Sequence, residues 1–126
     1  RAIPANRIVL AGFSQGGAMS LQLLRLAPER VTFAVNLSGY AAGGELPGDA
    51  ILAETRPPVF WGRGSADEVI PESAIAHTAE WLPEHSELIG RIYPGMGHSV
   101  SQEELTDLHH FLTLRYAAPT TAAPAS

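Results

Sequence analysis

Short apolar runs alternate along the chain with stretches whose apolar residues recur at helical spacing. The runs at residues 7–11, 32–37, 58–61 and 88–93 predict four strands. Helical stretches at residues 16–26, 50–54 and 72–82 separate them, and one more follows the last strand. Strands that alternate with helices form parallel sheets, so the pattern predicts an α/β fold with helices on both faces of the sheet.

A proline predicts the end of two of these helices, because proline lacks the amide hydrogen that continues a helix. The helix at residues 16–26 stops at Ala27-Pro28, and it is apolar enough that we expect it to be largely buried. The helix at residues 72–82 is expected to end at Pro83. Residues 41–49 are rich in glycine and predict a loop.

The last helix has the strongest start signal. Ser101 and Glu104 have the spacing of a capping box, with Val100 and Leu105 placed for a hydrophobic staple. Leu105, Leu108 and Leu112 then predict an apolar stripe. Residues 117–126 contain alanine, proline and threonine without periodicity. We therefore expect one partial domain at residues 1–116 and a disordered tail at residues 117–126.

The motif Gly-Phe-Ser-Gln-Gly at residues 12–16 lies between the first strand and the first helix. A sharp turn at this point strains the backbone of Ser14 and projects its hydroxyl over the sheet. We expect side chains at Gly12 and Gly16 to collide across so tight a turn. The helix also directs its N-terminal amides at the reacting atom. Ser14 is therefore a candidate nucleophile, although a plain glycine-rich turn is the alternative.

A nucleophilic serine needs a base and a carboxylate that orients the base. Asp67 follows the third strand and His98 follows the fourth. Taken singly, Asp67 is equally typical of a turn and His98 of a surface position. Together they give the order Ser14, Asp67, His98, which is that of an α/β-hydrolase. Glu68 is the rival carboxylate, and we prefer Asp67 because neighbouring loop residues rarely point the same way.

Composition narrows the function classes. The chain has 126 residues, of which 45% are hydrophobic and 17% charged, and this indicates a globular domain. The net charge of −5 disfavours nucleic acid as a partner. No apolar run approaches the ~20 residues of a membrane span. Without cysteine, and with His77, His85, His109 and His110 lacking a metal-ligand context, we expect no metal and no cofactor.

Four segments together resemble the phospholipase/carboxylesterase family, which includes acyl-protein thioesterases. The segments are G-F-S-Q-G-G-A (residues 12–18), L-S-G-Y (37–40), G-S-A-D-E-V-I-P (64–71) and G-M-G-H (95–98). The resemblance covers nearly the whole chain except the tail. It implies an α/β-hydrolase fold and a triad of Ser14, Asp67 and His98. It also implies a carboxylesterase or thioesterase that acts on small-molecule esters, lysophospholipids or acyl thioesters.

The same resemblance implies that an N-terminal half is missing. Family members carry earlier strands and a loop that donates a second oxyanion amide, beside the amide of Gln15. Without them, the strand at residues 7–11 becomes a sheet edge with an exposed apolar flank. We therefore expect a truncated fold of about four strands that pairs as a homodimer or with its missing segment.

Three functions remain open on this basis: an esterase, an inactive half-domain that needs complementation, and a serine peptidase of the same fold. Trp61, Val69, Ile70 and Met96 are candidates for an apolar acyl site, with core packing an equal alternative for each. Both oxidising and reducing compartments are compatible with a chain that lacks cysteine. Our expectation for the location is the cytoplasm.

Overall fold

The computed structural model describes residues 8–122 and contains every predicted strand and helix. The elements are β1 (Ile8–Phe13), α1 (Gln15–Leu26), the 3-10 turn η1 (Pro28–Arg30), β2 (Val31–Leu37), α2 (Gly48–Thr55), β3 (Pro58–Gly64), α3 (Glu72–His85), β4 (Glu87–Tyr93) and α4 (Gln102–Ala122). Most boundaries lie within three residues of the predicted ones. Residue 7 of the first predicted strand lies outside the described residues.

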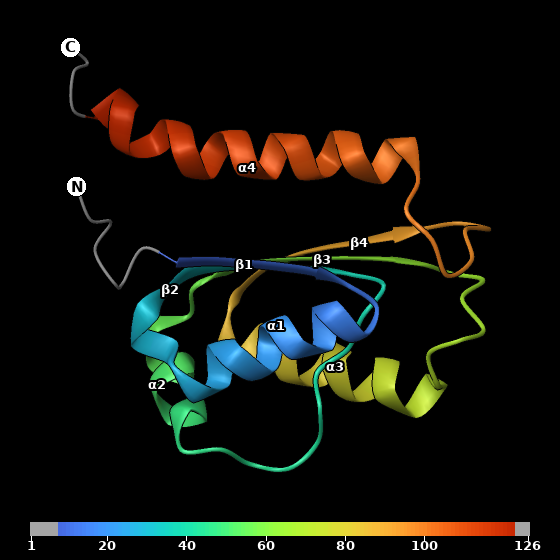
Figure 1. Cartoon of the computed structure of the whole chain (residues 1–126), viewed down its shortest axis with the longest axis horizontal. Helices are drawn as coiled ribbons and strands as arrows, with labels where there is room; N and C mark the ends of the chain where they lie inside the picture. The colour runs from blue at the N-terminus through green and yellow to red at the C-terminus, as the bar shows by residue number, and fades with distance from the viewer. Residues whose placement is uncertain (1–7, 123–126) are drawn as a thin grey trace.

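The four strands form one parallel sheet in the order β1-β2-β3-β4. Figure 1 shows α1, α2 and α3 on one face of this sheet and α4 on the other. The predicted α/β architecture is therefore confirmed. Phe13 pairs with Leu37, and Leu37 pairs with Gly62, so the carboxyl ends of three neighbouring strands meet at one end of the sheet. As predicted, β1 is an edge strand of the described sheet.

Two core clusters lie on opposite faces of the sheet, as the alternation of side chains along a strand requires. On β3, Val59 and Trp61 belong to the cluster beneath α1, α2 and α3. Phe60, between them in sequence, belongs to the cluster beneath α4 with Phe33 and Phe111. Because both faces are covered, β3 is apolar at every one of these positions.

Helix α1 is only half buried, and the prediction of a largely buried helix is wrong. Leu21 and Leu24 are fully buried against the sheet, whereas Met19, Leu23 and Leu26 are 58%, 44% and 60% exposed. The helix packs mainly on β1 and β2 through one face. No element within residues 8–122 covers the other face, which leaves an exposed apolar surface.

Helix α3 continues beyond Pro83 to His85, so the predicted stop at this proline is wrong. A proline in the last turn removes only one amide donor, and side chains satisfy the carbonyl groups nearby. The ring Nδ1 of His85 lies 2.7 Å from the Trp81 carbonyl oxygen. The Ser86 hydroxyl donates to the Leu82 carbonyl at 2.7 Å.

Helix α4 confirms half of the predicted capping box. The Glu104 amide donates to the Ser101 hydroxyl at 3.1 Å, but neither Glu104 carboxyl oxygen has a hydrogen-bond partner in the described structure. Leu108 and Leu112 pack on the core together with Phe111.

The predictions for Leu105 and for the tail after residue 116 differ from the structure where it describes them. Leu105 is 46% exposed, so its place in the predicted stripe is wrong, and the staple stays a prediction. The helix includes residues 117–122, where the sequence predicts a disordered tail. Residues 123–126 of that tail lie outside the described residues.

A buried ion pair joins α1 to the first turn of α2. Arg25 is 1% exposed and binds the Asp49 carboxylate through Nε and Nη2 at 2.8 and 2.9 Å. It also donates to the carbonyl groups of Ala42 and Gly44. These bonds satisfy the guanidinium on several sides, which is the condition under which a buried charge is tolerated.

Asp49→Asn is expected to lower the free energy of unfolding by about 3 kcal/mol at neutral pH, since it leaves Arg25 buried without its counter-charge. The Arg25 hydrogen bonds hold the pKa of Asp49 below its ordinary value of 3.8. The stabilisation is therefore present above this value and is lost as the pH falls through the lowered pKa. Urea unfolding near neutrality and at about pH 2 measures this, with the exposed Glu45→Gln as control. A difference that persists undiminished in acid contradicts the assignment.

Candidate active site

Ser14 occupies the turn between β1 and α1 in a strained conformation. Its φ of 59° and ψ of −118° lie outside the regions that L-residues favour. Its amide donates to the Leu37 carbonyl at 2.8 Å, which fixes the turn to the end of β2. The predicted strain at Ser14 is therefore confirmed. Gln15 begins α1, and its amide is among the first amides of the helix, which have no partner within the helix.

The glycines of the motif have different roles. A Cβ at Gly12 would collide with the Gly16 carbonyl group, which confirms the prediction for Gly12. The prediction for Gly16 is wrong, because a Cβ there would meet no atom within 4 Å. Gly17 is the glycine that packs closely instead, since a Cβ added there would lie 2.8 Å from the Asn36 side-chain oxygen. Asn36, fully buried on β2, is thus a packing residue of the turn that the sequence reasoning missed.

Gly12→Ala and Gly16→Ala form a matched pair. Gly12→Ala is expected to destabilise the chain by more than about 3 kcal/mol, because backbone atoms must move to admit the methyl group. Gly16→Ala is expected to be neutral or to stabilise by up to about 1 kcal/mol, since alanine favours the helix. Thermal unfolding of both variants checks the pair. Equal losses would contradict the turn geometry.

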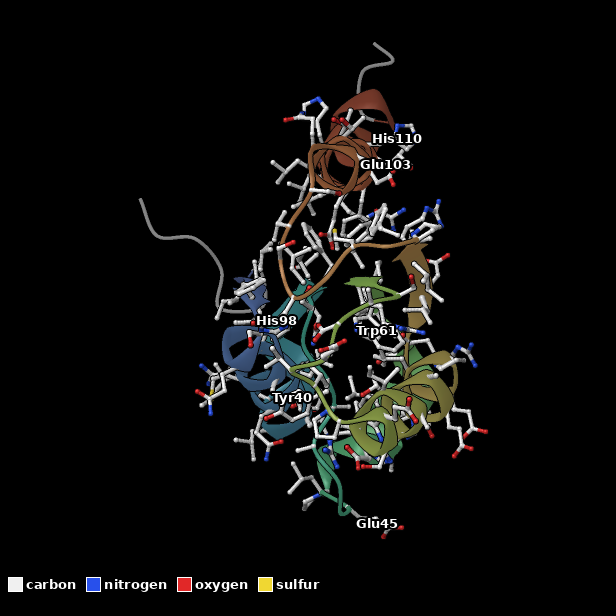
Figure 2. The ribbon with its side chains drawn as sticks, turned by 90° about the vertical axis from the view of Figure 1, so that its right-hand side faces the viewer. Tyr40, Glu45, Trp61, His98, Glu103 and His110 are labelled. Atoms are coloured by element: carbon white, nitrogen blue, oxygen red, sulfur yellow. The ribbon has the colours of Figure 1, made fainter. Side chains whose placement is uncertain are left out.

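A continuous chain of hydrogen bonds joins the three predicted residues. His98 Nε2 lies 2.7 Å from Ser14 Oγ, and His98 Nδ1 lies 2.8 Å from Asp67 Oδ2. These residues follow β1, β3 and β4, and the sheet brings them to one end. Figure 2 shows His98 beside the blue N-terminal part of the chain that carries Ser14. The arrangement has the geometry by which an imidazole removes a proton from a hydroxyl group.

The surroundings of Asp67 favour its ionised form. Its side chain is 2% exposed, and this burial raises the pKa. The hydrogen bond with His98 and the amides of Val69 and Ile70, which donate to Oδ1 at 2.8 and 3.2 Å, lower the pKa further than burial raises it. The carboxylate is therefore charged at neutral pH and accepts a hydrogen bond from His98 Nδ1. Glu68 is exposed, and it is Asp67 that contacts His98.

Phe13 is a neighbour of the site that the sequence reasoning missed. Its ring centroid lies 5.0 Å from that of His98, with the planes tilted by 43°. The ring thus covers part of the imidazole while 43% of Phe13 remains exposed. The sequence does contain a signal for this contact. Phe13 directly precedes Ser14, so the turn that positions the serine also positions Phe13 near the site.

The four residues predicted for an acyl site lie in different environments. Trp61 is 6% exposed in the core, and its Nε1 donates to the Gly39 carbonyl at 3.4 Å, so core packing describes it. Ile70 is buried, Val69 is 62% exposed, and Met96 is partly exposed.

A cavity of about 310 Å³, which was not predicted, lies along α1 and begins at Gln15, the residue after Ser14 in sequence. Its lining residues are Gln15, Ala18, Met19, Gln22, Tyr40 and Ala42. Helix α1 supplies the first four of them, and Tyr40 is labelled in Figure 2.

The other histidines lie apart from this arrangement. His109 and His110 are exposed on α4, and His77 and His85 are partly buried on α3. Within residues 8–122, no three side chains of the metal-binding types cluster in a way that could hold a metal ion. None of the helices in this part of the chain is long and apolar enough to cross a bilayer.

A parallel sheet that places a strained serine, a histidine and a carboxylate in this order and at this end has the α/β-hydrolase fold. The model of the phospholipase/carboxylesterase family matches residues 1–116, and the chain belongs to this family.

Known proteins similar to the chain agree with this assignment. The chain is 36% identical to acyl-protein thioesterase 1 of Debaryomyces hansenii, with 87% of the chain and 49% of that protein covered. It is 33% identical to a probable carboxylesterase of Oryza sativa subsp. japonica, with 87% and 42% covered. The crystal structure of Arabidopsis thaliana SOBER1 superposes with a TM-score of 0.73 at 25% identity, covering 90% of the chain and 55% of that structure. The chain thus spans about half the length of the curated relatives it matches.

Proposed function

We propose that the chain carries the catalytic triad of a carboxylic-ester hydrolase that works through an acyl-enzyme intermediate. Its substrates are small acyl esters, lysophospholipids or acyl thioesters. The observation that carries this proposal is the unbroken hydrogen-bond chain from Ser14 through His98 to Asp67. The names of the relatives, acyl-protein thioesterase and carboxylesterase, support the same reaction class.

In the first half of the reaction, His98 Nε2 takes the proton of the Ser14 hydroxyl as Oγ attacks the carbonyl carbon of the substrate. Asp67 keeps the proton of His98 on Nδ1, so that Nε2 is the free base, and stabilises the imidazolium that forms. His98 then donates its proton to the leaving alkoxide or thiolate. Ser14 is left as an ester of the acyl group.

In the second half, water takes the place of the leaving group. His98 Nε2 removes a proton from this water as it attacks the acyl-enzyme carbonyl, and returns the proton to Ser14 Oγ as the acid departs. Phe13 against one side of the imidazole restricts its movement between these two transfers.

The developing oxyanion needs hydrogen-bond donors that are already in place. The amide of Gln15 directly follows the nucleophile and lies at the positive end of α1. Hydrolases of this fold use a second amide, and losing one such donor lowers turnover by roughly 10²–10³-fold. The proposal therefore assigns Gln15 one of two oxyanion contacts.

The cavity along α1 is our candidate for the substrate's apolar portion. It begins at Gln15, next to the nucleophile, and continues along α1 past Ala18 to the exposed Met19. Methionine adapts its shape to apolar chains of different length. This position lies along α1, and the earlier candidates Val69, Ile70 and Met96 stay predictions.

The test compares hydrolysis of p-nitrophenyl acetate, a short acyl thioester and a peptide anilide by the same preparation. We expect the ester and the thioester to be cleaved and the anilide to be inert. Preferential cleavage of the anilide would favour the peptidase alternative instead. Cleavage of none of the three, also with the complementing segment described below, would contradict the proposal.

A second candidate function is supported by the exposed flank of the fold. Strand β1 is an edge of the described sheet, and its Ile8 and Phe13 are 40% and 43% exposed. The outer face of α1, a helix that packs on β1, is apolar and exposed as well. Because the chain also spans about half the length of its relatives, we propose that activity requires a second segment, which pairs with β1 and supplies the other oxyanion amide.

Adding the N-terminal half of a family relative as a separate polypeptide tests this dependence. The expected result is a roughly 10²–10³-fold rise in ester hydrolysis, with a complex of one copy of each partner by size-exclusion chromatography. Full activity of the chain alone would contradict it. A stable homodimer that the added half does not dissociate would assign the flank to self-association instead.

A further inference from the structure

The loop that carries His98 is attached to the sheet at two buried points outside the hydrogen-bond chain. The first is Ser38, which directly follows β2. Its hydroxyl donates to the carbonyl oxygen of Ser99 at 3.1 Å, one residue after His98. Ser38 is 1% exposed, and its φ of 55° is in the left-handed region that few serines adopt. A strained, buried serine that contacts the histidine loop indicates a constrained position.

The second point is Glu104 on α4. Its side chain is 0% exposed, and neither carboxyl oxygen has a hydrogen-bond partner in the described structure. A Cβ at Gly62 would collide with Glu104 Oε2, so the carboxyl group lies directly on the bare Cα of this glycine. Glu104 lies in the first turn of α4, six residues after His98, and this turn is thereby packed on the carboxyl end of β3.

Gly62 connects the two points, because its carbonyl oxygen accepts the amide of Ser38 at 2.8 Å. The ends of β2 and β3 and the start of α4 therefore form one buried cluster beneath the histidine loop. We call Ser38, Gly62 and Glu104 the loop clamp. A displacement of either attachment moves the backbone on one side of His98.

The position of the Glu104 carboxyl group disfavours its charged form. Burial raises its pKa, and the neighbouring Asp107 raises it as well, while the Ser101 amide lowers it less. From β4, the Tyr93 hydroxyl donates to Asp107 at 2.7 Å and not to Glu104. Neither Glu104 oxygen accepts a hydrogen bond from an arginine or histidine in the described structure.

We propose that Ser38 and Glu104 are positioning residues that hold His98 in line between Ser14 and Asp67. This inference rests on the proposed function, since it assigns the clamp a role in the same site. Neither residue touches the reacting atoms. They act through the backbone of residues 99–104, which fixes the distance of His98 from both partners. A shift of about 1 Å at a catalytic base lowers the rate by up to about a hundredfold.

The test uses a signal that reports the position of His98 without turnover. A proton on Nδ1 that is hydrogen-bonded to Asp67 gives a far-downfield resonance in the proton NMR spectrum. We expect this resonance in the parent chain and in E104Q, which keeps the size and shape of the side chain. We expect it to broaden or vanish in S38A and E104A. The exposed residues Ser73 and Glu103 provide the matched controls S73A and E103A.

A second readout is the rate at which Ser14 reacts with a fluorophosphonate. It is expected to fall by up to about a hundredfold in S38A and E104A and to stay at the parent value in E104Q, S73A and E103A. Circular dichroism during unfolding sets a temperature at which every variant is folded. Should E104A not fold, S38A carries the same test, because it removes a single hydroxyl group.

The outcomes separate the clamp from the proposed function. If the parent shows the resonance and folded S38A and E104A keep both it and the parent rate, the clamp is overturned while the triad stands. Lower stability with an unchanged resonance likewise overturns it, because the two residues are then merely structural. If the parent chain lacks the resonance, the bond between His98 and Asp67 is absent, and the proposed function fails together with the clamp.

Discussion

Replacement of Ser14 by alanine is expected to lower ester hydrolysis by about 10⁶-fold, to the level of the uncatalysed reaction plus binding effects. His98→Ala is expected to give a similar loss, and the double variant no further loss, because the two residues act as one unit. The physical reason is the 2.7 Å contact between His98 Nε2 and Ser14 Oγ, through which the hydroxyl loses its proton. Initial rates with p-nitrophenyl acetate measure all three variants, with the complementing segment added where activity requires it.

The control for these variants is Ser73→Ala, which removes an exposed hydroxyl and should leave the rate unchanged. Losses that multiplied in the double variant would mean that Ser14 and His98 act independently. A Ser14→Ala variant as active as the parent would remove the assignment of the nucleophile.

The second large effect is expected for Asp67→Asn, with a loss of about 10⁴-fold in turnover near neutral pH. Asparagine keeps the shape of the side chain but donates from its amide, so that His98 takes the tautomer with its proton on Nε2. The parent is unaffected by the ionisation of Asp67 across this range, because its pKa lies below the ordinary value of 3.8. The loss should therefore be present throughout the neutral range and not only in acid.

Glu68→Gln is the matched control, since this exposed carboxylate is the neighbour of Asp67 in sequence. Its turnover should remain within about twofold of the parent, in keeping with a surface substitution. If Glu68→Gln lost as much activity as Asp67→Asn, the assignment of Asp67 as the carboxylate that orients His98 would be contradicted.

Much of the fold follows from local signals. The alternation of apolar runs with helical stretches predicts all four strands and their parallel arrangement, because each run is short and bounded by glycine, proline or polar residues. The order Ser14, Asp67, His98 was also accessible from the sequence, since each residue directly follows a different strand. Parallel strands then bring the three loops to the same end of the sheet without further information.

What the sequence could not predict depends on contacts between elements. Gly16 and Gly17 are neighbours in the sequence, and only the position of Asn36 on β2 shows that a side chain would collide at Gly17 and not at Gly16. The exposure of Met19 depends on whether another element covers α1. Trp61 is placed in the core by the strand's alternation, which a four-residue run does not reveal.

Glu104 is the clearest case of a role hidden by a local motif. Its spacing from Ser101 predicts a capping box, and the amide half of that box is present. The carboxyl group instead lies against Gly62, 42 positions earlier in the chain. Such a contact is determined by the packing of α4 on the sheet, and a motif of four residues carries no information about it.

The most direct test of the central claim is the mass of the acyl-enzyme. The chain is mixed with p-nitrophenyl acetate, with the complementing segment present where activity requires it, quenched in acid and digested, and its peptides are weighed. The account predicts one added acetyl group on the peptide that contains Ser14, and none on this peptide in Ser14→Ala or His98→Ala. Acetylation that persists in both variants, or hydrolysis of the ester with no acetyl group on Ser14, would contradict it.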